Sequence, residues 1–154
     1  MNKNLIVFMP SIEGGGVEKN LFLVCNYLAK SISNLKVITI SNKYSNKFDK
    51  SIEIVSLRSR QWDRYGRKIK YFLALILLIK EILKNKKSTV FSFQANIYCI
   101  LVCKIFSVKV IARSNTAPIG WSRNFFKRMI FKVVLNLSDK VLVNSLEFKK
   151  ELKK

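Results

Sequence analysis

The fold of this chain is decided by one stretch near its start, Leu5-Ile6-Val7-Phe8-Met9-Pro10-Ser11-Ile12-Glu13-Gly14-Gly15-Gly16-Val17-Glu18-Lys19. Residues 5–9 form an unbroken apolar run, which is typical of a strand buried on both faces of a parallel sheet. After the glycines, apolar residues recur at helical spacing, which predicts an amphipathic helix over residues 17–30. A strand, a glycine loop and a helix in this order predict the opening unit of a parallel α/β sheet.

The glycine loop is the first candidate binding site. Gly14, Gly15 and Gly16 are three of the five glycines in the chain. A helix start carries unpaired N–H groups and the positive end of the dipole, and glycines let a phosphate approach the backbone. A phosphate-bearing ligand and a tight turn with a positive φ both fit these residues. Because Lys19 occupies the third glycine position of the dinucleotide fingerprint and no P-loop sequence is present, a nicotinamide cofactor is disfavoured.

Outside this stretch the chain continues to alternate strands with helices. Further strands are predicted at 35–40, 52–57, 88–93, 108–112 and 140–144, and further helices at 65–83, 97–106, 123–137 and 146–152. Short connections between such elements predict a doubly wound, Rossmann-like and mainly parallel α/β sheet of about six strands with helices on both faces. A length of 154 residues fits a single domain over residues 1–154.

Three of the later helices are rich in apolar residues. The helix 65–83 has a broad apolar face of Ile69, Phe72, Leu73, Ile76, Ile79 and Leu83. The helix 123–137 groups Phe125, Phe126, Met129, Ile130, Val133 and Val134 on one side. The helix 97–106 is apolar nearly all round, which predicts deep packing between the sheet and other helices.

Cysteine and histidine usage excludes several classes of enzyme. The chain has no histidine, which excludes a Ser-His-Asp triad, a Cys-His pair and a His-ligated metal. Cys25, Cys99 and Cys103 lack a fourth zinc ligand, so we expect no metal site and predict buried thiols in a reducing compartment. The apolar runs 71–79 and 90–102 are too short to span a bilayer, and no signal peptide is recognised. We therefore expect a cytoplasmic protein.

The charge of the chain is strongly positive. Lys and Arg number 29 against 9 Asp and Glu, and the formal net charge is +20. Such a field favours nucleic acid or an anionic membrane surface as a partner, although an AT-rich coding sequence also yields many lysines. The most basic window, residues 58–70, interleaves cations with Trp62 and Tyr65. Its candidate anion or membrane contacts are Arg58, Arg60, Arg64, Arg67, Lys68 and Lys70.

This basic window has three interpretations. Basic residues with tryptophan and tyrosine suit a membrane interface, and the same residue types bind single-stranded nucleic acid by stacking. Nucleic acid is the weaker interpretation, because the sequence carries no recognised nucleic-acid-binding signature. The third interpretation is a solvated loop that binds no partner.

With these elements placed, three segments resemble a known family. The segment Gly14-Gly15-Gly16-Val17-Glu18-Lys19-Asn20-Leu21 resembles the G-G-x-E-[RK]-x-L segment that opens the amino-terminal domain of family-4-type glycosyltransferases of the GT-B fold. Arg113-Ser114-Asn115, at the end of the fifth predicted strand, resembles the R-x-N of one branch of that family. Ser138-Asp139-Lys140-Val141-Leu142-Val143-Asn144-Ser145 resembles its A-D-x-V-x-x-N-S segment. The three segments lie in the family's order.

The resemblance implies transfer of a sugar from a nucleotide-sugar, usually with retention, onto a glycan or a lipid-linked acceptor. It implies no cofactor beyond the nucleotide-sugar substrate. In such enzymes the amino-terminal domain chiefly binds the acceptor, and its glycine loop approaches the donor diphosphate. The resemblance places Gly14, Gly15 and Gly16 at that diphosphate and Arg113 and Asn115 near the acceptor or the reacting sugar. Ligands of open α/β sheets do lie beyond the carboxyl ends of strands.

The sequence departs from the family by lacking the second domain, which holds most of the nucleotide site. We therefore expect a domain that is inactive alone, either a truncated enzyme or one subunit of a split enzyme with a separate donor-domain subunit. Its product would be a cell-surface glycan or glycolipid made at the inner face of the cytoplasmic membrane. For Glu18, orienting the helix start is favoured over a direct ligand role. The alternatives are a non-catalytic basic protein on an anionic membrane or nucleic acid, and an inactive remnant.

Overall fold

The structure is a computed structural model that describes residues 4–57, 62, 64–94, 96–115, 124–146 and 149–150. Its elements in chain order are β1 Asn4–Phe8, α1 Gly16–Ala29, β2 Asn34–Ile38, η1 Ser45–Lys47, β3 Glu53–Val55, α2 Arg67–Lys84, β4 Thr89–Ser92, α3 Asn96–Ile105, β5 Lys109–Ser114, α5 Phe125–Asn136 and β6 Lys140–Val143. These elements match the predicted alternation of strands and helices. The helix predicted at 146–152 lies partly outside the described residues.

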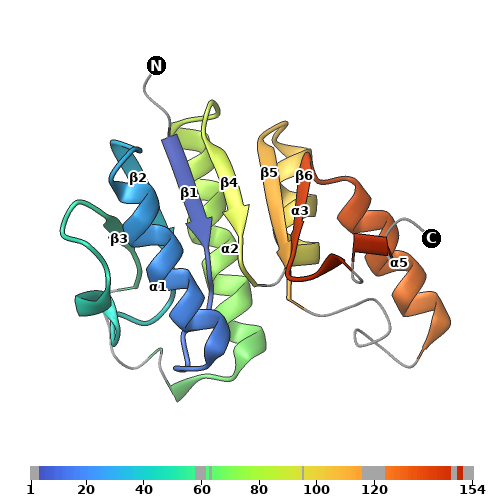
Figure 1. Ribbon diagram of the computed structural model, residues 1–154, viewed down its shortest axis with the longest axis horizontal. Helices are drawn as coiled ribbons and strands as arrows, with labels where there is room; N and C mark the ends of the chain where they lie inside the picture. Colours follow the sequence, from blue (N-terminus) through green and yellow to red (C-terminus); the bar gives the residue numbers. More distant parts are fainter. Residues whose placement is uncertain are drawn as a thin grey trace.

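The strands form one parallel sheet in the order β3-β2-β1-β4-β5-β6 (Figure 1). On one side of β1, Leu5 pairs with Leu35 of β2, and on the other side it pairs with Thr89 of β4. The strand order reverses between β1 and β4. This confirms the predicted doubly wound, Rossmann-like sheet.

The two faces of the sheet are covered by different helices. In β1, Ile6 and Phe8 belong to the core cluster shared with α2, α3 and α5, whereas Leu5 and Val7 belong to the cluster shared with α1. Figure 1 shows α1 in front of the sheet and α2 and α3 behind it. The opening apolar run is therefore buried on both faces, as its composition predicts.

The apolar faces of the later helices are less buried than their periodicity indicates. In α2 the buried residues are Ala74, Leu78, Glu81 and Ile82, while Phe72 is 65% exposed. The reason is that α2 is apolar around most of its circumference and can bury only the stripe that meets the sheet. None of the six residues of the predicted face is buried, because Ile69, Phe72, Ile76 and Leu83 are exposed and Leu73 and Ile79 are half-buried.

The deep packing expected of α3 is wrong for its outer side. Cys99, Ile100 and Cys103 are fully buried, but Tyr98 is 55% exposed and Ile105 is 76% exposed. α3 contacts α2 and α5 as neighbours in one layer, and no described element covers that layer from outside. A helix that is contacted only by the helices beside it in the same layer keeps its outward-facing residues exposed to solvent.

Candidate functional site

The candidate site lies at the carboxyl ends of β1, β4 and β5, next to the point where the strand order reverses. Ligands of open α/β sheets bind at this edge. Three segments meet there: the glycine loop after β1, residues Phe93 and Gln94 after β4, and Asn115 after β5. The backbone N–H of Ser11 donates to Gln94 Oε1 at 3.3 Å and so links the first two segments.

The glycine loop needs its glycines for two different reasons. Gly14 has a φ of +95°, a left-handed conformation that side chains disfavour, and a Cβ there would lie 3.2 Å from the Tyr44 hydroxyl. A Cβ on Gly15 would lie 2.9 Å from Glu18 Oε2. At Gly16 nothing lies within 4 Å of the Cβ position, so the loop is open to a ligand at this residue. The tight turn predicted for the loop is therefore confirmed at Gly14.

The side chain of Glu18 contacts the glycine loop. Its side chain is buried, and its Oε1 accepts a hydrogen bond of 3.4 Å from the backbone N–H of Glu13. As the third residue of α1, it also places a carboxylate at the positive end of the helix dipole. These contacts correspond to the orienting role predicted for Glu18.

A second carboxylate ties the loop to the start of α2. Glu13 accepts two hydrogen bonds from Arg67, at 2.6 Å from Nη2 and 3.2 Å from Nε, and a third from Ser11 Oγ at 3.0 Å. Hydrogen bonding, first from Arg67 and then from Ser11, lowers the pKa of Glu13. Arg67, predicted as an anion contact, is therefore paired within the domain and anchors the loop.

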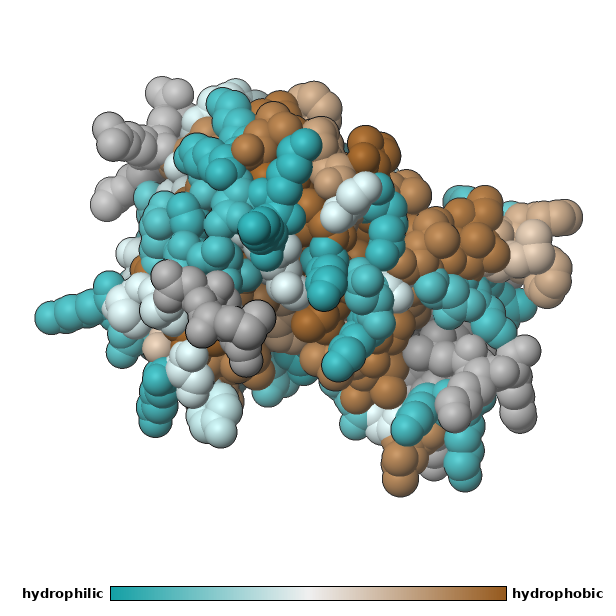
Figure 2. Space-filling model, turned by 90° about the horizontal axis from the view of Figure 1, so that it is seen from above, coloured by the Kyte–Doolittle hydropathy of each residue, from teal (hydrophilic) through white to brown (hydrophobic). Residues whose placement is uncertain are grey.

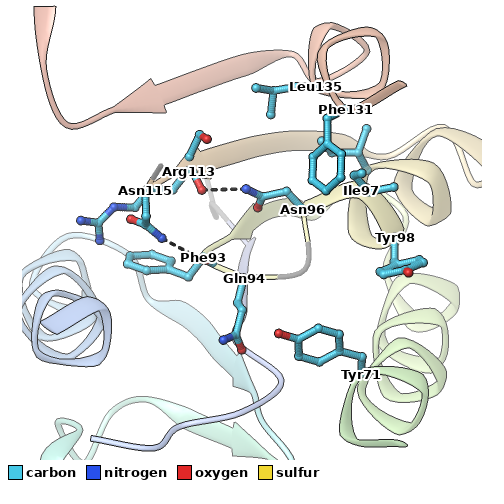
Figure 3. A pocket seen from close by; sticks show the side chains of 12 residues that line it. Tyr71, Phe93, Gln94, Asn96, Ile97, Tyr98, Arg113, Asn115, Phe131 and Leu135 are labelled. Atoms are coloured by element: carbon cyan, nitrogen blue, oxygen red, sulfur yellow. Dashed lines mark hydrogen bonds between the residues drawn. The ribbon is translucent and has the colours of Figure 1, made fainter. Parts of the chain in front are cut away.

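A pocket of about 370 Å³ opens beside the loop, between α2, α3 and α5 and the ends of β4 and β5 (Figure 3). Its polar lining residues are Gln94, Asn96, Arg113, Ser114 and Asn115. Its aromatic lining residues are Tyr71, Phe93, Tyr98 and Phe131. No carboxylate is found among the described residues that line it.

Two asparagines in the pocket share one arrangement. Asn96 Nδ2 donates to the Arg113 carbonyl oxygen at 2.7 Å, and Asn115 Nδ2 donates to the Phe93 carbonyl oxygen at 3.3 Å. Both Oδ1 atoms are buried, and neither has a hydrogen-bond partner among the described residues. A buried acceptor without a donor is costly, so each oxygen favours a ligand or water that donates to it.

Arg113 is positioned by an aromatic ring. Its guanidinium lies 4.9 Å from the centroid of Phe93, and its Nη2 donates to Asn144 Oδ1 at 3.5 Å. Burial lowers the pKa of Arg113, but arginine stays charged at physiological pH. The pocket therefore combines aromatic walls, amide acceptors and one cation, groups that suit a hydroxylated ring.

The structure brings together some of the predicted site residues and separates others. Arg113 and Asn115 line the pocket, whereas the three glycines lie outside it, beyond the contact between Ser11 and Gln94. In the basic window, Arg58 and Arg60 lie outside the described residues. The other members lie before or at the start of α2, are exposed or half-buried, and do not line the pocket: Arg64, Arg67, Lys68 and Lys70.

Sequence reasoning missed several pocket residues. Gln94 and Asn96 lie within the apolar run 90–102 and were not selected as site residues, yet they follow β4 as Asn115 follows β5. The rule that ligands lie beyond strand ends would have found them. Tyr71 and Phe131 come from α2 and α5, and only the packing of these helices brings them to the pocket.

No protein-family model and no curated protein matches this chain. Among solved structures, the chain is similar to UGT2 of Phytolacca americana, determined in complex with UDP-2-fluoro-glucose and pterostilbene. The TM-score is 0.57 at 9% sequence identity, and the match covers 93% of this chain and 48% of UGT2. The chain thus spans about half the length of this neighbour. The domain has a glycosyltransferase-like, Rossmann-type fold.

Proposed function

We propose that residues 1–154 form the acceptor-binding domain of a sugar transferase that uses a nucleotide-sugar donor. The observation that carries this proposal is the pocket between aromatic walls in which two buried amide oxygens, on Asn96 and Asn115, have no hydrogen-bond partner among the described residues. Sugar hydroxyls donate hydrogen bonds, and sugar rings pack on aromatic side chains. The neighbour in fold was determined with both a UDP-sugar and a second, non-nucleotide ligand, which supports a two-substrate reaction.

In this proposal the acceptor lies in the pocket and the donor diphosphate lies over the glycine loop. The three segments that resemble family-4-type enzymes support this assignment, as does the open surface at Gly16. Arg113, held on the Phe93 ring, lines the pocket and would hold the acceptor or the reacting sugar. A second, donor-binding domain, in the same or a separate polypeptide, would complete the nucleotide site. The product would be a cell-surface glycan or glycolipid.

The acceptor part of the proposal is tested with a glycan and glycolipid array probed by the domain. We expect binding to a restricted set of sugars. Asn96→Leu and Asn115→Leu should each weaken it about 2- to 10-fold, the range of one lost hydrogen bond. The matched control is Asn46→Leu, an exposed asparagine of η1 outside the pocket. Thermal unfolding checks that each variant is folded. The acceptor assignment fails if wild type binds no sugar on the array.

The donor part is tested separately, by nucleotide-sugar turnover with the domain joined to or mixed with its donor domain. Gly15→Val should reduce turnover and leave array binding unchanged, because Gly15 does not line the pocket. Equal turnover by wild type and Gly15→Val would contradict a role for the loop at the diphosphate.

A further inference from the structure

The helices α2, α3 and α5 form one layer whose outer surface is largely apolar. We call this surface the outer helix face. Its exposed apolar residues are Ile69, Phe72, Ile76 and Leu83 of α2, Tyr98, Leu101 and Ile105 of α3, and Phe125, Phe126, Met129, Ile130, Val133 and Leu137 of and just after α5. α3 contacts both α2 and α5, which makes the stripes neighbours. Figure 2 shows apolar side chains gathered at the end of the molecule that α5 forms, at the right.

The charges on these helices are almost all positive. Glu81 is the only acid within α2, α3 and α5. It is 5% exposed and paired with Lys36 and Lys84, so it leaves no negative charge on the outer helix face. Six cations of α2 and α5 form no ion pair with a described residue: Lys68, Lys70, Lys80, Lys127, Arg128 and Lys132.

We propose that the outer helix face binds the surface of an anionic lipid bilayer. Helices with exposed aromatic and aliphatic residues on one side and cations around them lie in the interface plane, where the apolar groups enter the acyl boundary and the cations meet lipid phosphates. Phe125 and Phe126 at the start of α5 are 64% and 68% exposed. None of the helices in the described part of the chain is long and apolar enough to cross a bilayer. In this proposal the domain lies on the surface of the bilayer.

The positive charge around the outer helix face favours an anionic bilayer over a second copy of the chain as its partner. Pairing two outer helix faces would bring lysines and arginines against each other with no acid between them, and like charges across an interface are costly. An anionic bilayer offers the opposite charge over a broad area. Tyr98 belongs both to this face and to the pocket lining, so docking would hold the pocket beside the lipid surface.

The test is flotation of the domain with vesicles of phosphatidylglycerol and phosphatidylcholine, against phosphatidylcholine alone. We expect flotation only with the anionic vesicles, and a loss of at least about 10-fold in partitioning for Phe125→Ser/Phe126→Ser. The matched control is Leu23→Ser/Tyr27→Ser on α1, where both side chains are 70% or more exposed on the opposite side of the sheet. Lys80→Glu/Lys127→Glu should also weaken flotation.

Three results would overturn the proposal. They are no flotation of wild type, equal loss in the control and test variants, and a wild-type dimer in sedimentation that Phe125→Ser/Phe126→Ser dissociates while vesicle binding is absent. The last would make a second copy the partner. Circular dichroism checks that the variants are folded. Flotation requires no sugar binding, so its outcome is independent of the array and turnover experiments.

Discussion

Replacing Gly15 with alanine tests the account of the glycine loop most directly. The new Cβ would lie 2.9 Å from Glu18 Oε2, too close for either atom to stay in place. Gly15 has a φ of −84°, which alanine adopts without strain. The backbone therefore stays, and the buried Glu18 carboxylate has to move. The whole penalty of Gly15→Ala should come from Glu18.

The expected cost is the sum of three contributions. Loss of the hydrogen bond from the Glu13 N–H costs about 1 kcal/mol. Moving the carboxylate from the helix start costs about 0.5 kcal/mol. Alanine also restricts the unfolded chain more than glycine does, which stabilises the folded domain by about 0.5 kcal/mol. Gly15→Ala should therefore destabilise the domain by about 1 kcal/mol, measured by urea unfolding.

A double-mutant cycle separates this mechanism from a general intolerance of the loop. In a Glu18→Ala background the contact is already absent, so Gly15→Ala should become neutral or stabilise by about 0.5 kcal/mol. Gly16→Ala is the matched control, because its Cβ position is open. An equal loss from Gly15→Ala with and without Glu18 would refute the reasoning.

Three further predictions concern ionisable groups. Because Arg67 lowers the folded-state pKa of Glu13, their contact stabilises the fold above the ordinary glutamate pKa and is lost as pH falls through the folded pKa. Arg67→Gln should raise that pKa in an NMR titration, and an unchanged value would count against the ion pair. Lys36→Met removes one of the two ion-pair partners of the buried Glu81. It should lower the free energy of unfolding, measured in urea, by about 2 kcal/mol. An unchanged free energy would mean that Lys84 alone is enough to compensate the Glu81 charge. Burial raises the pKa of the Cys25 thiol to about 12, so iodoacetamide at pH 8 should label Cys25 only after unfolding, as mass spectrometry can follow.

The sheet was predictable because its signals are local. Residues 5–9 are apolar without interruption, and the later strands are short apolar or β-branched runs, most of them followed by a helical period. Such runs fix parallel strands and their alternation with helices. The side of a helix that meets the sheet is not a local property. α2 offers apolar residues in most directions, and its contact with β2 and α3 decides that Leu78 is buried and Phe72 is not.

The candidate site was predictable where it follows strand ends and unpredictable where helices build it. Arg113 and Asn115 end a strand and resemble a family motif, so sequence alone selected them. Tyr71 and Phe131 lie 60 positions apart in the sequence, and only tertiary packing unites them. The ion pair between Glu13 and Arg67 was missed for the same reason, since no sequence pattern relates a loop after β1 to the start of α2.

The position of β1 between β2 and β4 gives it one partner that is near in sequence and one that is distant. β1, α1, β2 and β3 are neighbours in sequence and can pair while the rest of the chain is still being synthesised. Pairing of Leu5 with Thr89 must await α2 and closes a long loop, which is entropically slower. We therefore expect the glycine loop to belong to the half that folds early and the pocket to the half that folds late. The hydrogen bond between Ser11 and Gln94 forms when the two halves join, so we expect the glycine loop and the pocket to come side by side only at that step.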